Sequence, residues 1–221
     1  MLKKPVIVVN FKTYKQGTGA NALKLAKLCD HVALELDASI AVAVQVIDLA
    51  RIASSVRIPV FAQHADGFEL GAHTGAISPE ALQYAGAAGT LINHSEWKIP
   101  LRNIVAAVKQ CAKFDLDVIA CADTPQAAKE ISVARPAFIA IEPPELIGGT
   151  ISVSAARPEV ITETTRNVRI PVLCGAGIHT RQDVAKAIEL GTVGVLVASG
   201  VVLSKDPEAV LKELVLGLRN E

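Results

Sequence analysis

The sequence predicts a single (β/α)8 barrel domain that covers residues 1–221. Short runs of β-branched and apolar residues recur along the whole chain, and segments with helix-start chemistry separate them. Neither a linker nor a shift in composition divides the chain. The runs are apolar almost throughout, as expected of parallel strands that are buried on both faces. They comprise residues 6–10, 39–44, 60–63, 89–92, 117–121, 138–141, 171–174 and 194–197.

The number of strand–helix units favours a closed α/β barrel. A flavodoxin-like doubly wound sheet is the structural alternative, but it normally needs only about five or six strands. The chain has 221 residues, which is below the roughly 250 that are typical of such barrels. Some helices should therefore be shortened, and residues 157–168 are a good candidate.

The predicted helices begin at recognisable capping residues. Ser78, Thr124 and Asp206 are each followed by a proline, so each would cap a helix whose first position suits that proline. Another helix begins at Thr180, and Asp183 three residues later makes an acidic variant of the capping box. These signals alternate with the apolar runs, as a barrel requires.

The composition indicates a chain with a large apolar core and no net charge. Apolar residues make up 51% and charged residues 20%, and 22 basic residues balance 22 acidic ones. That balance argues against the basic surface of a nucleic-acid-binding protein. Polar or glycine residues interrupt the apolar stretches before they could span a bilayer. Since the N-terminus has no signal-peptide pattern, we expect a soluble, cytoplasmic protein without nucleic-acid or membrane partners.

No motif predicts a cofactor or a metal. Cys29, Cys111, Cys121 and Cys174 lack metal-ligand spacing and are expected to be reduced and mostly buried. Histidines and carboxylates do not cluster with such spacing either. A dinucleotide fingerprint fails because Thr180 stands where its third glycine would be.

In this fold the active site lies at the C-terminal ends of the strands. The small residues that follow the last two predicted strands would let backbone N–H groups approach a phosphate. They favour a phosphate site there, although a glycine at a strand end often marks only a turn. The polar and small residues at the strand ends are Asn10, Lys12, Gln63, His64, Asn93, His94, Ser95, Glu96, Glu142, Gly175, Ala176, Gly177, Ala198, Ser199 and Gly200.

Three of these residues suggest acid–base chemistry. Glu142 precedes a loop with two prolines and two glycines, so it is either a base beside a closing lid or a solvated glutamate before an ordinary loop. His94 is either catalytic or simply packed at a strand end. Lys12 would lie over the barrel mouth, where a buried cation needs an anion such as Glu96 or a substrate phosphate. Together they could transfer a proton next to a carbonyl, which is the chemistry of an isomerase.

The other four histidines are expected to lie outside this chemistry. His31 and His179 fall on predicted helices. His64 and His73 fall in the loop after the third predicted strand.

Five segments along the chain resemble the signatures of the triosephosphate isomerase family. They occur in that family's order, at the expected strands, and they cover the chain from end to end. The two prolines after Glu142, the segment that begins at Cys174 and the reduced length resemble the family's short archaeal branch. The segments are Asn10-Phe11-Lys12, Gly71-Ala72-His73-Thr74-Gly75, Asn93-His94-Ser95-Glu96, Glu142-Pro143-Pro144-Glu145-Leu146-Ile147-Gly148 and Gly175-Ala176-Gly177-Ile178.

The resemblance implies a TIM barrel, a reaction and a role for each matching residue. The reaction would interconvert dihydroxyacetone phosphate and D-glyceraldehyde 3-phosphate through an enediol(ate), in glycolysis and gluconeogenesis. Glu142 would move the proton, and neutral His94 would hydrogen-bond the carbonyl, because it opens a short helix at residues 95–98 that disfavours imidazolium. Lys12 would bind the phosphate and the developing oxyanion, Asn10 would orient the substrate, and Glu96 would pair with Lys12. Backbone contacts to substrate are implied for Ile147, Gly177, Ala198 and Ser199.

The resemblance also implies a homo-oligomer. The loop from His64 to Gly75 would insert into a neighbouring subunit, with Thr74 near that subunit's site, to form a dimer unit. Shortened helices would expose apolar surface and pair dimers into a homotetramer. Trp97 and Lys98 depart from the family pattern, because most relatives have two basic residues there.

Two alternatives remain at this point. One is another phosphate-binding barrel enzyme of sugar-phosphate or tryptophan biosynthesis, such as a phosphoribosylanthranilate isomerase or an indole-glycerol-phosphate synthase. Those enzymes use other acid–base residues at their strand ends. The other is a non-catalytic barrel kept for binding, which would be expected to have lost Lys12, His94 or Glu142, whereas all three are present.

Overall fold

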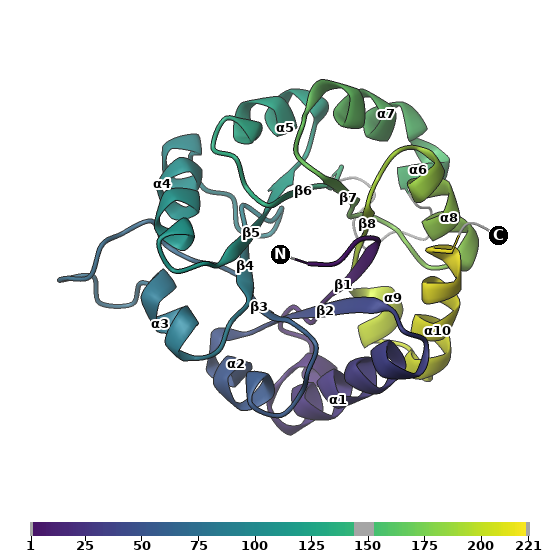
Figure 1. The fold of residues 1–221 in the computed structure, drawn as a ribbon, viewed down its shortest axis with the longest axis horizontal. Coiled ribbons are helices and arrows are strands. Elements are labelled where there is room, and N and C mark those ends of the chain that lie inside the picture. Colours follow the sequence, from purple (N-terminus) through teal and green to yellow (C-terminus); the bar gives the residue numbers. More distant parts are fainter. Residues whose placement is uncertain (1, 144–152, 220–221) are drawn as a thin grey trace.

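A computed structural model describes residues 2–143 and 153–219 of the chain. Eight parallel strands form a closed barrel in sequence order, and β8 pairs with β1 to complete it. The helices lie around the outside of this barrel (Figure 1). The predicted (β/α)8 fold is therefore confirmed. The strands are β1 (Val6–Asn10), β2 (Ser39–Val44), β3 (Val60–Ala62), β4 (Gly89–Ile92), β5 (Asp117–Ala122), β6 (Phe138–Ile141), β7 (Val172–Cys174) and β8 (Gly194–Val197).

The helices begin where the capping residues predict. Ser78, Thr124 and Asp206 each accept a hydrogen bond from the backbone N–H of the third helical residue. Thr180 and Asp183 form a reciprocal capping box. The helices are η1 (Lys15–Gly17, a 3-10 turn), α1 (Gly19–Glu35), α2 (Val46–Ala53), α3 (Pro79–Tyr84), α4 (Leu101–Ala112), α5 (Pro125–Ser132), α6 (Val153–Ala156), α7 (Pro158–Asn167), α8 (Arg181–Glu189), α9 (Ser199–Val202) and α10 (Pro207–Gly217).

Shortened helices occur, but not at the predicted place. α7 fills residues 158–167 with ten residues, close to the average helix length of about 11 to 12. Its buried stripe of Val160, Ile161 and Thr164 anchors it to the barrel. α3 has only six residues and α2 has eight. Because α7 is longer than both of them, the expectation of a short helix at 157–168 is wrong. Among the helices in the described residues, none has the length and apolar character needed to cross a membrane.

Alternate residues of each strand face two different apolar cores. In β1, Val6 and Val8 belong to the cluster inside the barrel, while Ile7 and Val9 belong to the cluster between the strands and the helices. Burial on both faces explains why the strands are continuous apolar runs. The largest side chains of the inner cluster, such as Phe61, are fully buried. The barrel interior is therefore a packed core, and the site lies at its end.

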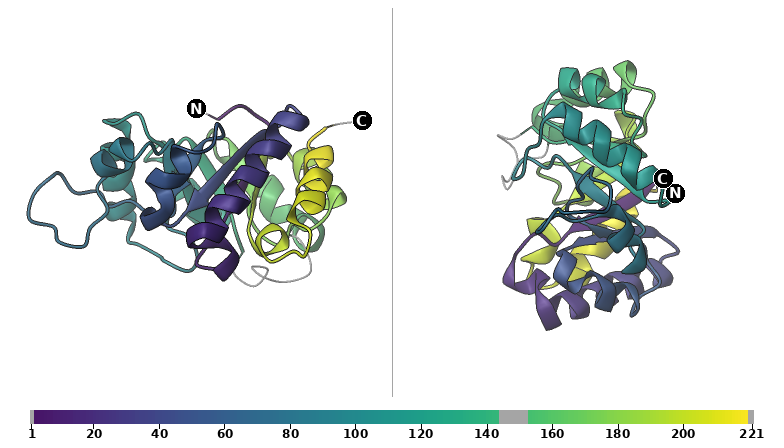
Figure 2. Two further views of the ribbon diagram at one scale, coloured as in Figure 1. Left: turned by 90° about the horizontal axis from the view of Figure 1, so that it is seen from below. Right: turned by 90° about the vertical axis from the view of Figure 1, so that its left-hand side faces the viewer.

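One segment departs from the compact outline of the barrel. The residues between β3 and α3 project outward (Figure 1 and the left view of Figure 2). At the base of this loop, the backbone N–H of Asp66 donates to the carbonyl of Ile77, and the N–H of Ile77 donates to Oδ2 of Asp66, both at 2.8 Å. Phe68 and Leu70 are exposed on the loop. The base of the loop is thus fixed, and the loop presents two exposed apolar side chains.

Candidate active site

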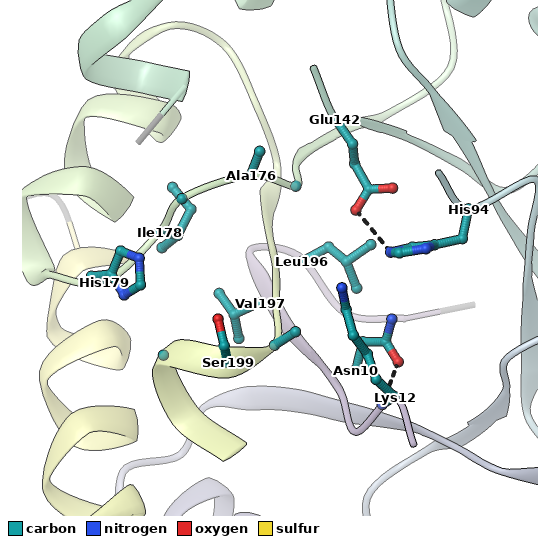
Figure 3. A pocket seen from close by; sticks show the side chains of 14 residues that line it. Asn10, Lys12, His94, Glu142, Ala176, Ile178, His179, Leu196, Val197 and Ser199 are labelled. Carbon is teal, nitrogen blue, oxygen red and sulfur yellow. Dashed lines mark hydrogen bonds and ion pairs between the residues drawn. The ribbon is translucent and has the colours of Figure 1, made fainter. Parts of the chain in front are cut away.

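A pocket at the C-terminal ends of the strands gathers most of the predicted site residues. It lies among the segments that follow β1, β4, β6, β7 and β8 (Figure 3). Glu96 lies beside this pocket and contacts Lys12. Ile147 and the predicted lid after Pro143 lie outside the described residues. The pocket is lined by Asn10, Lys12, His94, Glu142, Gly175, Ala176, Gly177, Ile178, His179, Leu196, Val197, Ala198, Ser199 and Gly200.

Lys12 follows β1 in a left-handed backbone conformation, with φ of 47°. Asn10 Oδ1 accepts a hydrogen bond from the Lys12 N–H at 3.0 Å. Gln63 Nε2 donates to Asn10 Oδ1 at 3.2 Å and to the Lys12 carbonyl at 3.0 Å. These bonds hold a backbone shape that residues with side chains rarely adopt. The Lys12 side chain is 10% exposed, and its Nζ lies 2.7 Å from Glu96 Oε1. The ammonium is therefore paired with Glu96, one of the two anions that the sequence predicts for it.

His94 presents a protonated Nε2 to the pocket. Its Nδ1 accepts a hydrogen bond from the Glu96 backbone N–H at 3.2 Å, so the proton of the neutral ring is on Nε2. Nε2 lies 3.6 Å from Glu142 Oε1, and the two side chains point toward each other (Figure 3). Burial, and then the charge of Lys12, lower the pKa of His94 to about 4. The ring is therefore neutral near pH 7 and can donate a hydrogen bond to a substrate oxygen.

The cause of this neutral state differs from the one predicted. Residues 94–97 form a turn in which the Trp97 N–H donates to the His94 carbonyl at 2.8 Å, and residues 95–98 do not begin a helix. A single turn lacks the aligned peptide dipoles of a helix. Burial and the ammonium of Lys12 replace the helix N-terminus as the explanation.

Glu142 is a buried carboxylate that directly follows β6. It is 2% exposed, and its Oε2 has no hydrogen-bond partner among the described residues. Burial raises the pKa of Glu142 to about 7, against the opposing effects of the Cys121 thiol and the Lys12 ammonium. A carboxylate whose pKa is near the working pH is well suited to accept and return a proton.

Gly175 provides the space that Glu142 occupies. A Cβ atom at this position would lie 2.5 Å from Glu142 Cγ and 3.0 Å from Glu142 Oε1. The Gly175 N–H donates to the Ile141 carbonyl at 3.0 Å, so the backbone is tied to the neighbouring strand and cannot easily withdraw. Glycine is thus required here by the close approach of the carboxylate.

Gly175→Ala is expected to lower kcat by about 10- to 100-fold. The added methyl group displaces the carboxylate, and a misplacement of about 1 Å at a reacting centre can cost about 100-fold. Steady-state kinetics measures the effect, and circular dichroism with thermal unfolding establishes that the variant is folded. A folded variant with the kcat of the wild type would show that the position of Glu142 does not depend on Gly175.

Glu142→Gln is expected to stabilise the fold at alkaline pH and to have little effect at acid pH. The folded state raises the pKa of Glu142 from 4.5 to about 7, so it holds this proton more tightly than the unfolded chain between those values. The destabilisation caused by the buried charge is therefore absent below pH 4.5, grows through this window and is complete above pH 7. The pKa difference corresponds to on the order of 3 kcal/mol, and a neutral amide should recover part of it.

Denaturant unfolding of the wild type and this variant at pH 4 and pH 8 measures the difference in stability. The expected gain of the variant is about 1–3 kcal/mol at pH 8 and close to zero at pH 4. A variant that is less stable than the wild type at pH 8 would contradict the assignment of a buried, destabilising charge to Glu142.

Small residues after β7 and β8 line one side of the pocket, as the sequence predicts. Gly177 has a positive φ of 66°, and Ser199 begins α9 directly after Ala198. Such segments allow backbone N–H groups to approach an anion. His179 also lines this side, close to Gly200, where an added Cβ would lie 3.0 Å from its Nδ1. His179 precedes α8, so the expectation that it lies on a helix is wrong.

Lys98 retains a positive charge at the position where the family pattern differs. It pairs with Asp123, which follows β5. The charge of Lys98 lowers the pKa of both His94 and Glu142, and Asp123 opposes both effects. The Trp97 side chain is exposed. The departure at Trp97 and Lys98 therefore leaves an ion pair beside the site, in which the charges of Lys98 and Asp123 have opposite effects on the two pKa values.

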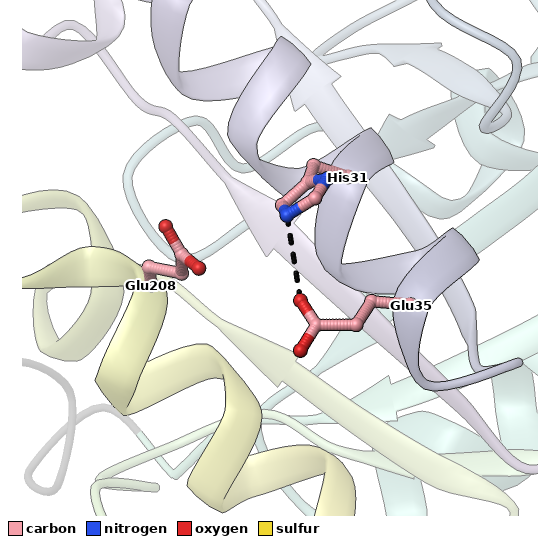
Figure 4. Close-up of side chains that lie close together, drawn as sticks. All are labelled: His31, Glu35 and Glu208. Carbon is pink, nitrogen blue, oxygen red and sulfur yellow. Dashed lines mark ion pairs between the residues drawn. The ribbon is translucent and has the colours of Figure 1, made fainter.

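One group of potential metal ligands lies on the outer surface, between α1 and α10. His31 and Glu35 on α1 approach Glu208 on α10 (Figure 4). Lys212 Nζ lies 2.8 Å from a Glu35 oxygen and 2.9 Å from a Glu208 oxygen. This ammonium already supplies the positive charge that the carboxylates attract, so the group is best described as a surface ion-pair network.

Comparison with known proteins gives a consistent assignment along the chain. The profile of the triosephosphate isomerase family matches residues 5–214. The triosephosphate isomerase of Methanothermus fervidus is 47% identical over 97% of this chain and 99% of its own. The enzyme of Methanobacterium bryantii is 46% identical over 96% of both chains, and that of Methanocaldococcus jannaschii is 44% identical over 95% of this chain and 98% of its own. The chain belongs to the triosephosphate isomerase family, and to the short archaeal form of it.

Proposed function

We propose that this isomerase interconverts dihydroxyacetone phosphate and D-glyceraldehyde 3-phosphate, with Glu142 as the base that moves the proton. The main support is a single juxtaposition in the pocket. A buried carboxylate with a raised pKa lies 3.6 Å from a neutral imidazole, His94, and the ammonium of Lys12 lines the same pocket. The names of the relatives point to the same reaction.

The first half of the proposed reaction forms an enediolate. Glu142 removes a proton from C1 of dihydroxyacetone phosphate, and the electrons of that C–H bond form a C1–C2 double bond. The C2 carbonyl oxygen takes up the negative charge, where the Nε2–H of His94 and the ammonium of Lys12 stabilise it. A general base contributes about 10²- to 10⁴-fold and an oxyanion donor about 3–4 kcal/mol, so these groups supply a large part of the catalysis.

The second half of the reaction carries out the reverse steps at C2. A proton moves from the C1 hydroxyl to the C2 oxygen through His94, and the carbonyl forms at C1. Glu142 then returns its proton to C2, which yields D-glyceraldehyde 3-phosphate. One proton leaves C1, one proton is added to C2 and the electron pairs stay on the substrate, so the net change is an isomerisation.

Substrate binding is assigned to the polar and small residues around this centre. Asn10 orients the substrate and Lys12 attracts its phosphate, while Glu96 holds Lys12 in place. Backbone N–H groups of Gly177, Ala198 and Ser199 bind the phosphate on the other side of the pocket, and Ile147, outside the described residues, is assigned to the same group. The setting is a single barrel domain that works in the cytoplasm, in glycolysis and gluconeogenesis.

The test of this function is a coupled assay of the interconversion in both directions, in buffer with and without a chelator. We expect fast turnover that the chelator does not reduce, because the proposed proton transfer uses only side chains and backbone groups. Absence of turnover in a folded, oligomeric preparation would overturn the assignment. The search would then move to other phosphosugar substrates for the same pocket.

We also propose that the protein is a homo-oligomer built from dimers, with a homotetramer as the expected assembly. The loop from His64 to Gly75 is the proposed dimer contact, with Thr74 near the neighbouring subunit's site. In support, this loop projects from the barrel (Figure 2) and exposes the apolar side chains of Phe68 and Leu70. Apolar side chains presented in this way are typical of protein interfaces.

Leu70→Glu is expected to weaken this assembly, because it places a charge among the exposed apolar side chains of the loop. Size-exclusion chromatography with light scattering should give a dimer or tetramer for the wild type and a shift toward monomer for the variant. Lys3→Glu, at an exposed position near the N-terminus, serves as a charge control. A wild type that is monomeric at micromolar concentration would refute the proposed assembly.

A further inference from the structure

The segment of residues 93–99 carries two of the proposed site residues, His94 and Glu96, and begins at Asn93. Asn93 directly follows β4 and is 7% exposed. Its φ is 56°, in the left-handed region, which asparagine tolerates better than most residues because its short side chain can bond locally. The chain therefore turns sharply where the barrel wall ends and the site begins.

The amide of Asn93 makes two hydrogen bonds in different directions. Its Oδ1 accepts from the backbone N–H of Ile99 at 3.0 Å, which joins the two ends of the 93–99 segment. Its Nδ2 donates to the carbonyl of Cys121 in β5 at 2.9 Å. One buried side chain thus closes the segment on itself and attaches it to the adjacent strand.

The shape of this closed segment determines two contacts at the site. The Glu96 N–H donates to His94 Nδ1 at 3.2 Å, and the Glu96 carboxylate lies 2.7 Å from the ammonium of Lys12. Both contacts depend on where Glu96 stands relative to its neighbours. If the segment opened, the Glu96 N–H would no longer reach His94 Nδ1. Neither of these two contacts would then keep the proton of the neutral ring on Nε2.

We propose that Asn93 is a positioning residue that selects the Nε2–H tautomer of His94 by closing the 93–99 segment. It does not line the pocket, so it acts through His94 and Glu96. The catalytic consequence rests on the proposed function, in which Nε2–H of His94 donates to the substrate carbonyl. The structural claim, which concerns the tautomer, can be measured without substrate.

Glycine separates the backbone requirement from the side-chain requirement. Asn93→Gly keeps the left-handed turn without strain, because glycine adopts positive φ readily, but it removes both amide hydrogen bonds. Asn93→Asp keeps the oxygen that accepts from Ile99 and removes the donor to Cys121. The matched control is Asp115→Gly, which changes another left-handed residue (φ 54°) that is exposed in the turn before β5, at the opposite end of the barrel.

The first readout is the ¹⁵N spectrum of the histidine side chains. The signals of His94 are assigned by comparison with His94→Gln, whose spectrum lacks them. Because burial and Lys12 lower the pKa of His94 to about 4, the ring is neutral at pH 7.5 and its two nitrogens report the tautomer directly. We expect a single Nε2–H form in the wild type, in Asp115→Gly and in Asn93→Asp. Asn93→Gly should show a mixture of the two neutral tautomers.

The second readout is steady-state kinetics at pH 7.5. Asn93→Gly should lower kcat by about 10- to 100-fold, as expected of a misplaced catalytic group, with KM changed less than about threefold. An unchanged tautomer and kcat in folded Asn93→Gly would overturn the inference. A tautomer mixture in Asn93→Asp equal to that in Asn93→Gly would also overturn it, since the Ile99 bond would then have no role. An inactive wild type with the expected tautomers would overturn the proposed function and leave this inference supported.

Discussion

Replacement of Glu142 with aspartate is expected to lower kcat by at least about 100-fold. The substitution keeps the charge but withdraws the carboxylate by one methylene from His94, whose Nε2 now lies 3.6 Å from Glu142 Oε1. Proton transfer requires near-contact geometry, and a misplacement of about 1 Å can cost about 100-fold. KM should change little, because the groups proposed to bind the phosphate come from other loops. Kinetics at pH 8, above the raised pKa of Glu142, measures the effect with the base ionised.

A matched control is Glu159→Asp, the same change at an exposed position on α7. It should leave kcat within about twofold of the wild type, because it removes no buried contact. The account of the base would be wrong if Glu142→Asp kept wild-type kcat. It would also be wrong if both variants lost activity equally, since the loss would then be unrelated to the pocket.

Replacement of Lys12 with methionine is expected to lower kcat/KM by at least about 100-fold. Methionine keeps much of the side-chain volume but removes the ammonium that lies 2.7 Å from Glu96 and lines the pocket. Loss of one preorganised charge at a developing oxyanion typically costs about 10²- to 10³-fold. The variant should also bind inorganic phosphate more weakly as a competitive inhibitor, because the same charge attracts the substrate phosphate.

The pH profile gives this variant a second signature. The charge of Lys12 lowers the pKa of Glu142, so its removal should raise that pKa and move the acid limb of kcat/KM to higher pH. Lys15→Met, at an exposed position in η1, is the control and should keep the wild-type profile. A Lys12→Met variant with wild-type phosphate affinity and an unshifted acid limb would remove Lys12 from both proposed roles.

The barrel itself could be predicted closely from the sequence, because parallel strands buried on both faces leave a strong apolar signal. β1, β2, β4, β6 and β8 have the predicted bounds. The small differences occur at strand ends. β7 begins at Val172 and not at Pro171, since proline has no N–H to donate to a strand ladder.

The conformation of residues 93–99 could not be predicted, because it depends on contacts between distant segments. Asn93 closes this segment through Ile99 and attaches it to Cys121 of another strand, and nothing in the local pattern distinguishes the resulting turn from a short helix. The prediction of a helix after His94 was wrong for this reason. The neutral state of His94 agrees with the prediction, although burial and Lys12 cause it.

Two contributors to the site were present in the sequence without a recognisable signal. Gln63 stands at a strand end, but its bonds to Asn10 and Lys12 appear only when β1 and β3 are placed on either side of β2. Gly175 was expected to serve the phosphate, whereas its closest neighbour is the Glu142 side chain. Both roles arise from barrel closure, which brings together residues that are far apart in the chain.

The most direct test of the central claim is the exchange of substrate hydrogen with solvent. In D₂O, the wild type should replace a C1 proton of dihydroxyacetone phosphate with deuterium, because the proton held by Glu142 can exchange before it is returned. Proton NMR of the substrate and product measures this, and Glu142→Gln should abolish it. Isomerisation or exchange by Glu142→Gln at the wild-type rate would contradict proton transfer by Glu142.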